Sequence, residues 1–326
     1  METAVVKRIS WIDTAKAIGI LLVVLGHYIQ TLYVRSGRGQ FAFHWIYSFH
    51  MPLFFFLSGL VYKHKKWHSF LQGLLKNLLI PTITFSILYF LYKALIIKEN
   101  IDWWGIIVCD RDSFMHLYWF MWTMFWTKLL YYIIHSFIQA PKIVLEISTA
   151  ILCICFLLKL NEFLIRMPLC LGNVPYVFVF FAVGVVIHNY KIGEVKVFVP
   201  LIILGLSLLI CVLRPASISY SLLSFDFAPI DYAKAFLGIF FICTIAQVLD
   251  ARLTLGIIKK IGEESMYVYL IHGFFFWGIY KRMLDYILNN SLLVWVYTIL
   301  FTVITIIIIH MLLNGFKKLK EKLYAT

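Results

Sequence analysis

The chain has 326 residues, of which 62% are hydrophobic and only 14% charged, and its formal net charge is +13. An average soluble domain is about 45–50% apolar and about 25% charged, so this composition excludes a soluble globular fold. Intrinsic disorder is excluded by the same numbers, and six cysteines in a chain of this length are too few for a small disulfide scaffold.

Ten apolar runs divide the chain, and each approaches the roughly 20 residues that a helix needs to cross a bilayer core about 30 Å thick. The runs are 11–32, 43–62, 78–97, 114–134, 143–160, 174–190, 197–213, 233–249, 265–285 and 292–314. The loops between them are too short to hold a soluble domain. We therefore predict an all-α, polytopic membrane protein of about ten transmembrane helices, with residues 1–326 forming one membrane-embedded domain.

The first run carries three ionisable residues, Asp13, Lys16 and His27, and we do not expect it to be a cleaved signal peptide. Ionisable side chains inside a span are costly and often functional. Asp13 and Lys16 are spaced to pair. Eleven residues separate Lys16 from His27, which places them about 20° apart around the helix and about 16 Å apart along it. Singly, Lys16 could be an interfacial anchor and His27 a packing residue; together on one face they indicate a site.

In the second run, His50 lies at a depth similar to that of His27, if the two helices are neighbours. The following Met51-Pro52 interrupts a regular helix and can shape a cavity. Ser58 and Gly59 permit close helix approach, for which simple packing is the plainer interpretation.

The later runs offer weaker candidates for lining a site. His116, Tyr118 and Trp119 lie at the start of the fourth run, and His272 lies in the ninth. The aromatic residues there could equally belong to an interfacial belt. Cys153 and Cys155 have no partner at zinc spacing, so we predict no metal site.

The Lys and Arg residues of the short loops predict the orientation. With the N-terminus inside, cytoplasmic segments hold 16 cations and external loops hold nine, which places both termini in the cytoplasm. The cations are spread over many loops, so we expect no nucleic-acid partner. Apart from lysines near the ends of runs, which are counted with the loops, four lysines fall within the runs: Lys16, Lys93, Lys128 and Lys234.

Several of these residues form blocks that resemble the integral-membrane acyltransferase-3 family, in its fucose 4-O-acetylase-like branch. The blocks are Trp11-Ile12-Asp13, Lys16 to Ile20, Val23 to His27, Phe49 to Gly59, Leu78 to Pro81, His116 to Phe120, and Ser265 to His272. The pattern Lys16-x10-His27 matches the family's cation–histidine motif. The paired arginines of some branches are replaced by lysines in the loop that follows residue 62.

The resemblance implies ten spans in the cytoplasmic membrane of a bacterium. It also implies transfer of an acyl group, usually acetyl, from cytoplasmic acetyl-CoA to a hydroxyl of an extracytoplasmic or lipid-linked glycan. The glycan would be a capsule, O-antigen or exopolysaccharide, so the chain would act in polysaccharide biosynthesis. His27 would be catalytic and Lys16 would assist the donor.

On this hypothesis, the CoA phosphates are attracted by Lys16 together with Lys63, Lys65, Lys66 and Lys76. His27 is either a general base toward the sugar hydroxyl or a covalent acyl carrier. His50 orients His27 or helps to bind the acceptor, and Tyr118 and Trp119 could stack on sugar rings.

A different class of protein also fits the composition: a polytopic transporter or flippase for a polar solute or glycan precursor. The chain lacks repeated halves with matched broken helices, and its polar residues crowd into the first two runs, which favours the enzyme. A non-catalytic membrane scaffold would leave Lys16, His27 and His50 unexplained. The sequence leaves the acceptor sugar and the oligomeric state open.

Overall fold

The protein is described from a computed structural model, which places residues 9–98, 117–188, 195–215, 218–226, 228–275, 279–288 and 290–324. These residues are helical apart from short connections and one isolated bridge between Ser219 and Ser224. The predicted all-α fold is therefore confirmed for the part of the chain that is described.

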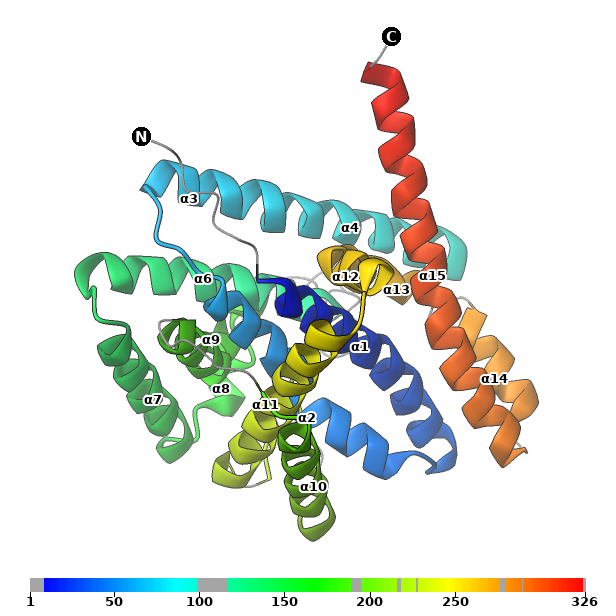
Figure 1. Cartoon of the computed structure of the whole chain (residues 1–326), viewed down its shortest axis with the longest axis horizontal. Helices are drawn as coiled ribbons and strands as arrows, with labels where there is room; N and C mark the ends of the chain where they lie inside the picture. The colour runs from blue at the N-terminus through cyan, green and yellow to red at the C-terminus, as the bar shows by residue number, and fades with distance from the viewer. Residues whose placement is uncertain are drawn as a thin grey trace.

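The helices follow the order of the predicted runs (Figure 1). They are α1 (Ser10–Ser36), α2 (Gln40–Leu60), α3 (Trp67–Leu74), α4 (Ile80–Leu91), α6 (Trp119–Phe137), α7 (Pro141–Leu157), α8 (Asn161–Leu164), α9 (Val174–His188), α10 (Phe198–Leu213), α11 (Ala228–Arg252), α12 (Gly256–Glu263), α13 (Ser265–Phe275), α14 (Lys281–Ile287) and α15 (Ser291–Tyr324). The π-helical segments Leu75–Leu79 and Tyr92–Ile97 continue α3 and α4, and a 3₁₀ segment, Pro168–Asn173, precedes α9.

Five helical stretches within the described residues are long and apolar enough to cross a membrane. They are Ser10–Ser36, Trp67–Ile96, Pro168–His188, Ala228–Arg252 and Ser291–Glu321, and Phe198–Leu213 is a shorter apolar helix. The chain is thus a multi-pass membrane protein. The count of ten spans and the cytoplasmic position of both termini stay predictions.

The boundaries differ most from the predicted runs in three places, of which the first is α15, which continues to Tyr324 although the predicted run ends at residue 314. The third helical stretch begins at Trp67, well before predicted residue 78, because an amphipathic turn of helix precedes the apolar segment. The predicted run 265–285 contains two helices, α13 and α14, with residues 276–278 between them outside the described part.

Helix α1 lies at the centre of the bundle, in contact with α2, α11, α12, α13 and α15. Its start is held by the Asp250 carboxylate of α11, which accepts a hydrogen bond from the Ser10 hydroxyl at 3.2 Å. The same carboxylate forms an ion pair with Lys259 of α12 at 2.6 Å. These contacts determine where Lys16, which lies less than two turns further along α1, is placed.

The most extensive helix contact joins α2 to α9, and it depends on two glycines. A Cβ added at Gly59 would lie 2.0 Å from the Phe181 carbonyl oxygen, and one at Gly184 would lie 2.2 Å from the Phe56 carbonyl oxygen. In a bilayer, no hydrophobic effect drives helices together, because lipid tails are as apolar as the helix surfaces. Membrane helices therefore often pack through small residues that let their backbones approach closely. The sequence-based interpretation of Gly59 as a packing residue agrees with this contact.

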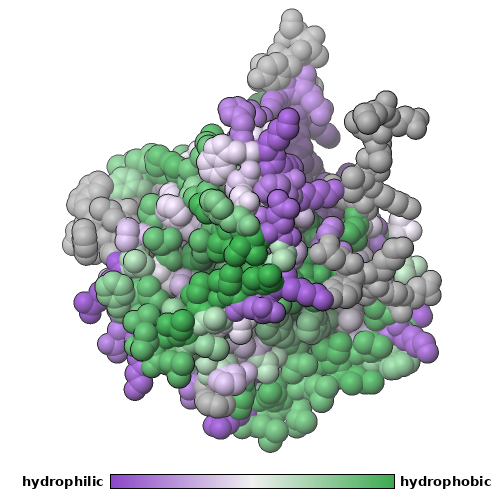
Figure 2. Space-filling view, turned by 90° about the vertical axis from the view of Figure 1, so that its left-hand side faces the viewer, coloured by the Kyte–Doolittle hydropathy of each residue, from purple (hydrophilic) through white to green (hydrophobic). Residues whose placement is uncertain are grey.

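Apolar side chains cover much of the outer surface (Figure 2). Exposed Leu and Ile residues are dense on α10 and α15, for example Leu201 and Ile202 on α10 and Leu292 and Leu300 on α15. Soluble proteins do not expose contiguous apolar surface of this extent, which is typical of a lipid-facing surface.

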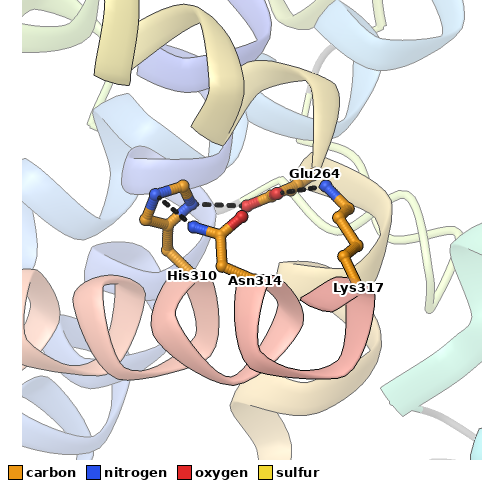
Figure 3. Close-up of polar contacts among 4 residues, drawn as sticks. All are labelled: Glu264, His310, Asn314 and Lys317. Carbon is orange, nitrogen blue, oxygen red and sulfur yellow. Dashed lines mark hydrogen bonds and ion pairs between the residues drawn. The ribbon is translucent and has the colours of Figure 1, made fainter. Parts of the chain in front are cut away.

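Helix α15 is tied to the junction of α12 and α13 by a polar cluster (Figure 3). The Glu264 carboxylate accepts hydrogen bonds from His310 Nδ1 at 2.7 Å and from Lys317 Nζ at 2.8 Å. Asn314 Nδ2 donates to His310 Nε2 at 2.9 Å, so the His310 proton lies on Nδ1. Beyond this cluster, the C-terminal part of α15 extends past the other helices (Figure 1).

Candidate active site

His27, which is partly exposed, is linked to two other histidines, one through direct ring stacking and one through Tyr47. The imidazole of His272, from α13, stacks on that of His27 with ring centroids 5.2 Å apart. The Tyr47 ring on α2 contacts two imidazoles: its centroid lies 6.0 Å from that of His27 and 4.7 Å from that of His50. The sequence predicted that His27 and His50 would lie at similar depth, and Tyr47 is what connects them.

The hydrogen bonds around Tyr47 determine which nitrogen of His27 carries the proton. The Tyr47 hydroxyl donates to Gln30 Oε1 at 2.7 Å, so its single proton is committed to that bond. The contact of 3.1 Å between the Tyr47 oxygen and His27 Nδ1 is then a bond donated by His27. His27 Nε2 is left without a proton and is the nitrogen able to act as base or nucleophile.

The other two imidazoles are also held through Nδ1. His50 Nδ1 donates to the Ile46 carbonyl at 2.9 Å, and His272 Nδ1 donates to the Tyr269 carbonyl at 2.7 Å. His272 is fully buried, and its Nε2 has no hydrogen-bond partner in the described structure. An unpaired buried acceptor costs about 1–3 kcal/mol, and such groups are concentrated at functional sites. The position of His272 beside His27 fits that pattern.

A cavity of about 460 Å³ lies beside α1, on the face that also carries His27. Its walls come from α1, α2, α3, α6 and the α12–α13 junction. Exposed residues of the connection between α2 and α3, among them Lys63 and Lys65, form part of the wall, so the cavity reaches the surface there. The inner wall is apolar and includes Met51 of α2.

The inner end of the cavity approaches the imidazole cluster. Ile20, Met51 and Tyr269 line the cavity, and each is close in the chain to a member of the cluster. Met51 follows His50 directly, and the Tyr269 ring lies 5.8 Å from the His272 ring. From Ile20 to His27 is seven residues, or about 10 Å along α1. These neighbours in the chain place the inner end of the cavity near the histidines.

Three of the five lysines predicted to bind the donor line this cavity: Lys16, Lys63 and Lys65. Lys66 and Lys76 are exposed and are not among its lining residues. Lys16 Nζ lies 3.5 Å from the Asp13 carboxylate, as the i,i+3 spacing predicted. Asp13 itself is buried at the start of α1.

The remaining predicted residues are more dispersed. Ser58 lines the cavity. Tyr118 is buried, and its hydroxyl donates to the Leu270 carbonyl at 3.0 Å, so it joins the start of α6 to α13. Trp119 is 8% exposed and packs beside it. His116 lies outside the described residues. The roles expected for these residues stay predictions.

Three residues of the site were not selected from the sequence: Gln30, Tyr47 and Lys128. Gln30 lies three residues after His27 and Tyr47 three residues before His50, so each occupies the same helix face as a selected histidine. Lys128 is one of the four lysines inside the predicted spans. The two spacings and the position of Lys128 inside an apolar run are the sequence signals that could have identified these residues.

A metal centre was not expected from the sequence, and that expectation stays a prediction. Within the described ranges, no three His, Cys, Asp or Glu side chains gather closely enough to hold a metal ion. The imidazoles of the described site can supply acid–base and nucleophilic chemistry beside a cavity with several cations.

Residues 9–312 match the acyltransferase-3 family, whose description is "acyltransferase domain". The chain is also 31% identical to the nodulation protein NolL of Mesorhizobium japonicum over 133 residues, which cover 38% of this chain and 35% of that protein. The chain thus matches only about a third of the length of that curated relative. No solved structure matches the chain. Because the family match covers nearly all of its length, the chain belongs to the acyltransferase-3 family.

Proposed function

We propose that this protein transfers an acetyl group from cytoplasmic acetyl-CoA to a hydroxyl of an extracytoplasmic or lipid-linked glycan, such as a capsule, O-antigen or exopolysaccharide. The membrane would be the cytoplasmic membrane of a bacterium. The observation that carries the proposal is the arrangement along one face of α1. Lys16 and the cavity come first, and His27 with its imidazole neighbours follows about 16 Å from Lys16.

The cavity suits a donor that has anionic phosphates at one end and a thioester at the other. Lys16, Lys63 and Lys65 provide cations, and Met51, Phe54 and other apolar side chains line the inner wall. A pantetheine arm that extends from Lys16 along α1 would carry the thioester toward His27. The thioester would pass Ile20, Met51 and Tyr269, which line the cavity, on its way to His27.

In the direct route, His27 Nε2 accepts the proton of the sugar hydroxyl while that oxygen attacks the thioester carbonyl carbon. The carbon–sulfur bond breaks, and the departing CoA sulfur takes the proton from His27. Tyr47 and Gln30 hold the Nδ1 proton throughout, so the base is always Nε2. In the covalent route, Nε2 attacks the thioester carbonyl carbon first, and the carbon–sulfur bond breaks to release the CoA thiolate. The sugar hydroxyl then attacks the acetyl-imidazole, the carbon–nitrogen bond breaks, and the hydroxyl proton goes to the thiolate.

The experiment that tests this function is the His27→Ala substitution in the full-length protein. We expect acetylation of the glycan to fall by about 10²–10⁴-fold, the usual contribution of a general base. The O-acetyl content of surface glycan is measured in cells that lack the native gene and express each variant at equal level in the membrane. His68→Ala is the control, because His68 is exposed on α3 and is not among the cavity-lining residues.

Normal acetylation by His27→Ala would refute the catalytic assignment. If the glycan failed to reach the surface without the protein, while purified protein transferred no acetyl group, the transporter would replace the enzyme as the better hypothesis. Incubation of the purified protein with labelled acetyl-CoA and no acceptor distinguishes the two routes, since label retained on His27 supports the covalent one.

A further inference from the structure

The four lysines inside the predicted spans do not share the same surroundings. Lys16 lies 3.5 Å from the Asp13 carboxylate. Lys234 is buried with Asp231 at 3.6 Å, and its Nζ donates to the Arg214 carbonyl at 2.7 Å. Lys93 is buried and also makes a polar interaction. Lys128, in contrast, forms no hydrogen bond or ion pair within the described residues. A charge inside a membrane protein without a partner is costly, so its retention needs another reason.

Lys128 faces the cavity from α6, and Lys16 faces it from α1. Both side chains line the same cavity, and like charges that share a site disfavour each other. Four lysines line the cavity. The acidic residue among the described lining side chains is Glu263, which is exposed. This excess of positive charge is relieved when an anion enters. Lysine serves as a point-charge ligand for phosphate, whose oxygens accept hydrogen bonds from the ammonium group.

We propose that Lys128 and Lys16 together bind the pyrophosphate of the acyl-CoA donor, one from each side of the cavity. This inference rests on the proposed function, because it names the donor group that the cavity receives. Lys63 and Lys65, which lie at the surface end, are then free to contact the 3′-phosphate of the nucleotide. The pyrophosphate is assigned to the inner pair because the span of about 16 Å from Lys16 to His27 suits the extended pantetheine arm that separates pyrophosphate from thioester.

A phosphate in this cavity could also belong to a lipid headgroup, since the protein is embedded in a bilayer. Both sources offer the same chemistry to an ammonium group. The two sources differ in the group attached to the phosphate, so the experiment tests both CoA donors and an anionic lipid.

The test compares Lys128→Met with the unchanged protein, purified at full length in nanodiscs of phosphatidylcholine. Four donors are used: acetyl-CoA, acetyl-dephospho-CoA, S-acetyl-4′-phosphopantetheine and S-acetylpantetheine. The Kd of each is measured directly, which does not require knowledge of the acceptor. We expect Lys128→Met to weaken binding of the first two donors by about tenfold or more, as for loss of a charged hydrogen bond. Binding of S-acetylpantetheine should not change, because that donor has no phosphate.

Two further variants make this result specific. Lys128→Arg keeps the charge and should restore most of the affinity for acetyl-CoA. Lys142→Met removes an exposed lysine at the start of α7, away from the cavity, and should bind every donor as the unchanged protein does. Because Lys128 has no carboxylate partner in the described structure, we also expect Lys128→Met to unfold at the same temperature as the unchanged protein or higher.

Equal affinity of Lys128→Met and the unchanged protein for acetyl-CoA would overturn the inference and leave the proposed function intact. Equal weakening for S-acetylpantetheine would overturn it too, because the contact would not be to phosphate. If phosphatidylglycerol nanodiscs raised the melting temperature only when Lys128 was present, and CoA did not, the anion would be a lipid. Failure of the unchanged protein to bind any of the four donors would instead contradict the proposed function.

Discussion

At the scale of single residues, the site depends on where protons lie. Tyr47 has one hydroxyl proton and gives it to Gln30, so its oxygen accepts from His27 Nδ1. This places the free lone pair of the His27 ring on Nε2. Metal-binding and catalytic histidines are commonly held in one tautomer by such a neighbour, and loss of the neighbour typically costs about 10–100-fold in metal affinity or activity.

Substitution Tyr47→Phe tests this interpretation. We expect kcat for acetyl transfer to fall by about tenfold or more, with the KM for acetyl-CoA nearly unchanged, because Tyr47 is not among the cavity-lining residues. The pH profile of kcat should also shift, since the acceptor of the Nδ1 proton is removed. Tyr297→Phe is the matched control, because that hydroxyl is buried on α15 without a partner in the described structure. An unchanged kcat, or an equal loss in the control, would contradict the role.

At the scale of helices, α15 is held against α13 by Glu264, whose carboxylate joins His310 and Lys317 (Figure 3). Burial of Glu264 raises its pKa, but the hydrogen bonds from Lys317 and His310 and the charge of Lys317 outweigh burial, and the net pKa lies below the ordinary value of 4.5. A carboxyl group whose pKa is lowered by folding stabilises the fold when it is ionised. That contribution is present above about pH 4.5 and is lost as the pH falls through the lower, folded-state pKa.

Substitution Glu264→Gln should therefore lower the melting temperature at pH 7, and the difference from the unchanged protein should shrink as the pH falls below about 4.5. Thermal unfolding in nanodiscs, followed by tryptophan fluorescence from pH 3 to pH 8, measures both effects. Glu146→Gln on α7 is a control, since Glu146 is exposed and no ion pair is found for it in the described part of the chain. A difference between Glu264→Gln and the unchanged protein that is constant over this range would show that ionisation of Glu264 does not matter.

At the scale of the whole molecule, the residues of the site are distributed along one central helix of the bundle. Helix α1 contacts five other helices, presents Lys16 to the cavity and presents His27 to the imidazole cluster. Under the proposed function, the donor approaches His27 through this cavity. This arrangement requires that the cavity opens on the side where acetyl-CoA is found.

The orientation predicted from the loop charges can be measured with reporter fusions. Alkaline phosphatase inserted at Gly39, between α1 and α2, should be active, because that connection is expected outside the cell. The same reporter inserted at Lys65 should be inactive, and green fluorescent protein fused at the C-terminus should fluoresce. The reverse pattern would place the cavity on the external side and would remove acetyl-CoA as the direct donor.

The composition and the periodicity of apolar runs were sufficient to determine the class of the protein and the order of its helices. Both depend on local properties: a span must be apolar along its own length, and an ionisable residue within it is conspicuous wherever it packs. His27, Lys16 and their common face on α1 follow from helical geometry alone. Five helical stretches of the described chain confirm the membrane class, although a charge-bearing helix such as α6 cannot be assigned as a span from length and apolarity.

The partners of those residues depended on the tertiary structure. His272 is 245 positions from His27 in the chain, and nothing in its local sequence indicates that their rings stack. Lys128 reads as an irregularity in an apolar run until α6 packs across the cavity from α1. Helix packing decides such contacts, because the side-chain surfaces that meet come from segments that share no local pattern. The sequence by itself thus determined which residues are costly to bury, and only the fold decided what each of them faces.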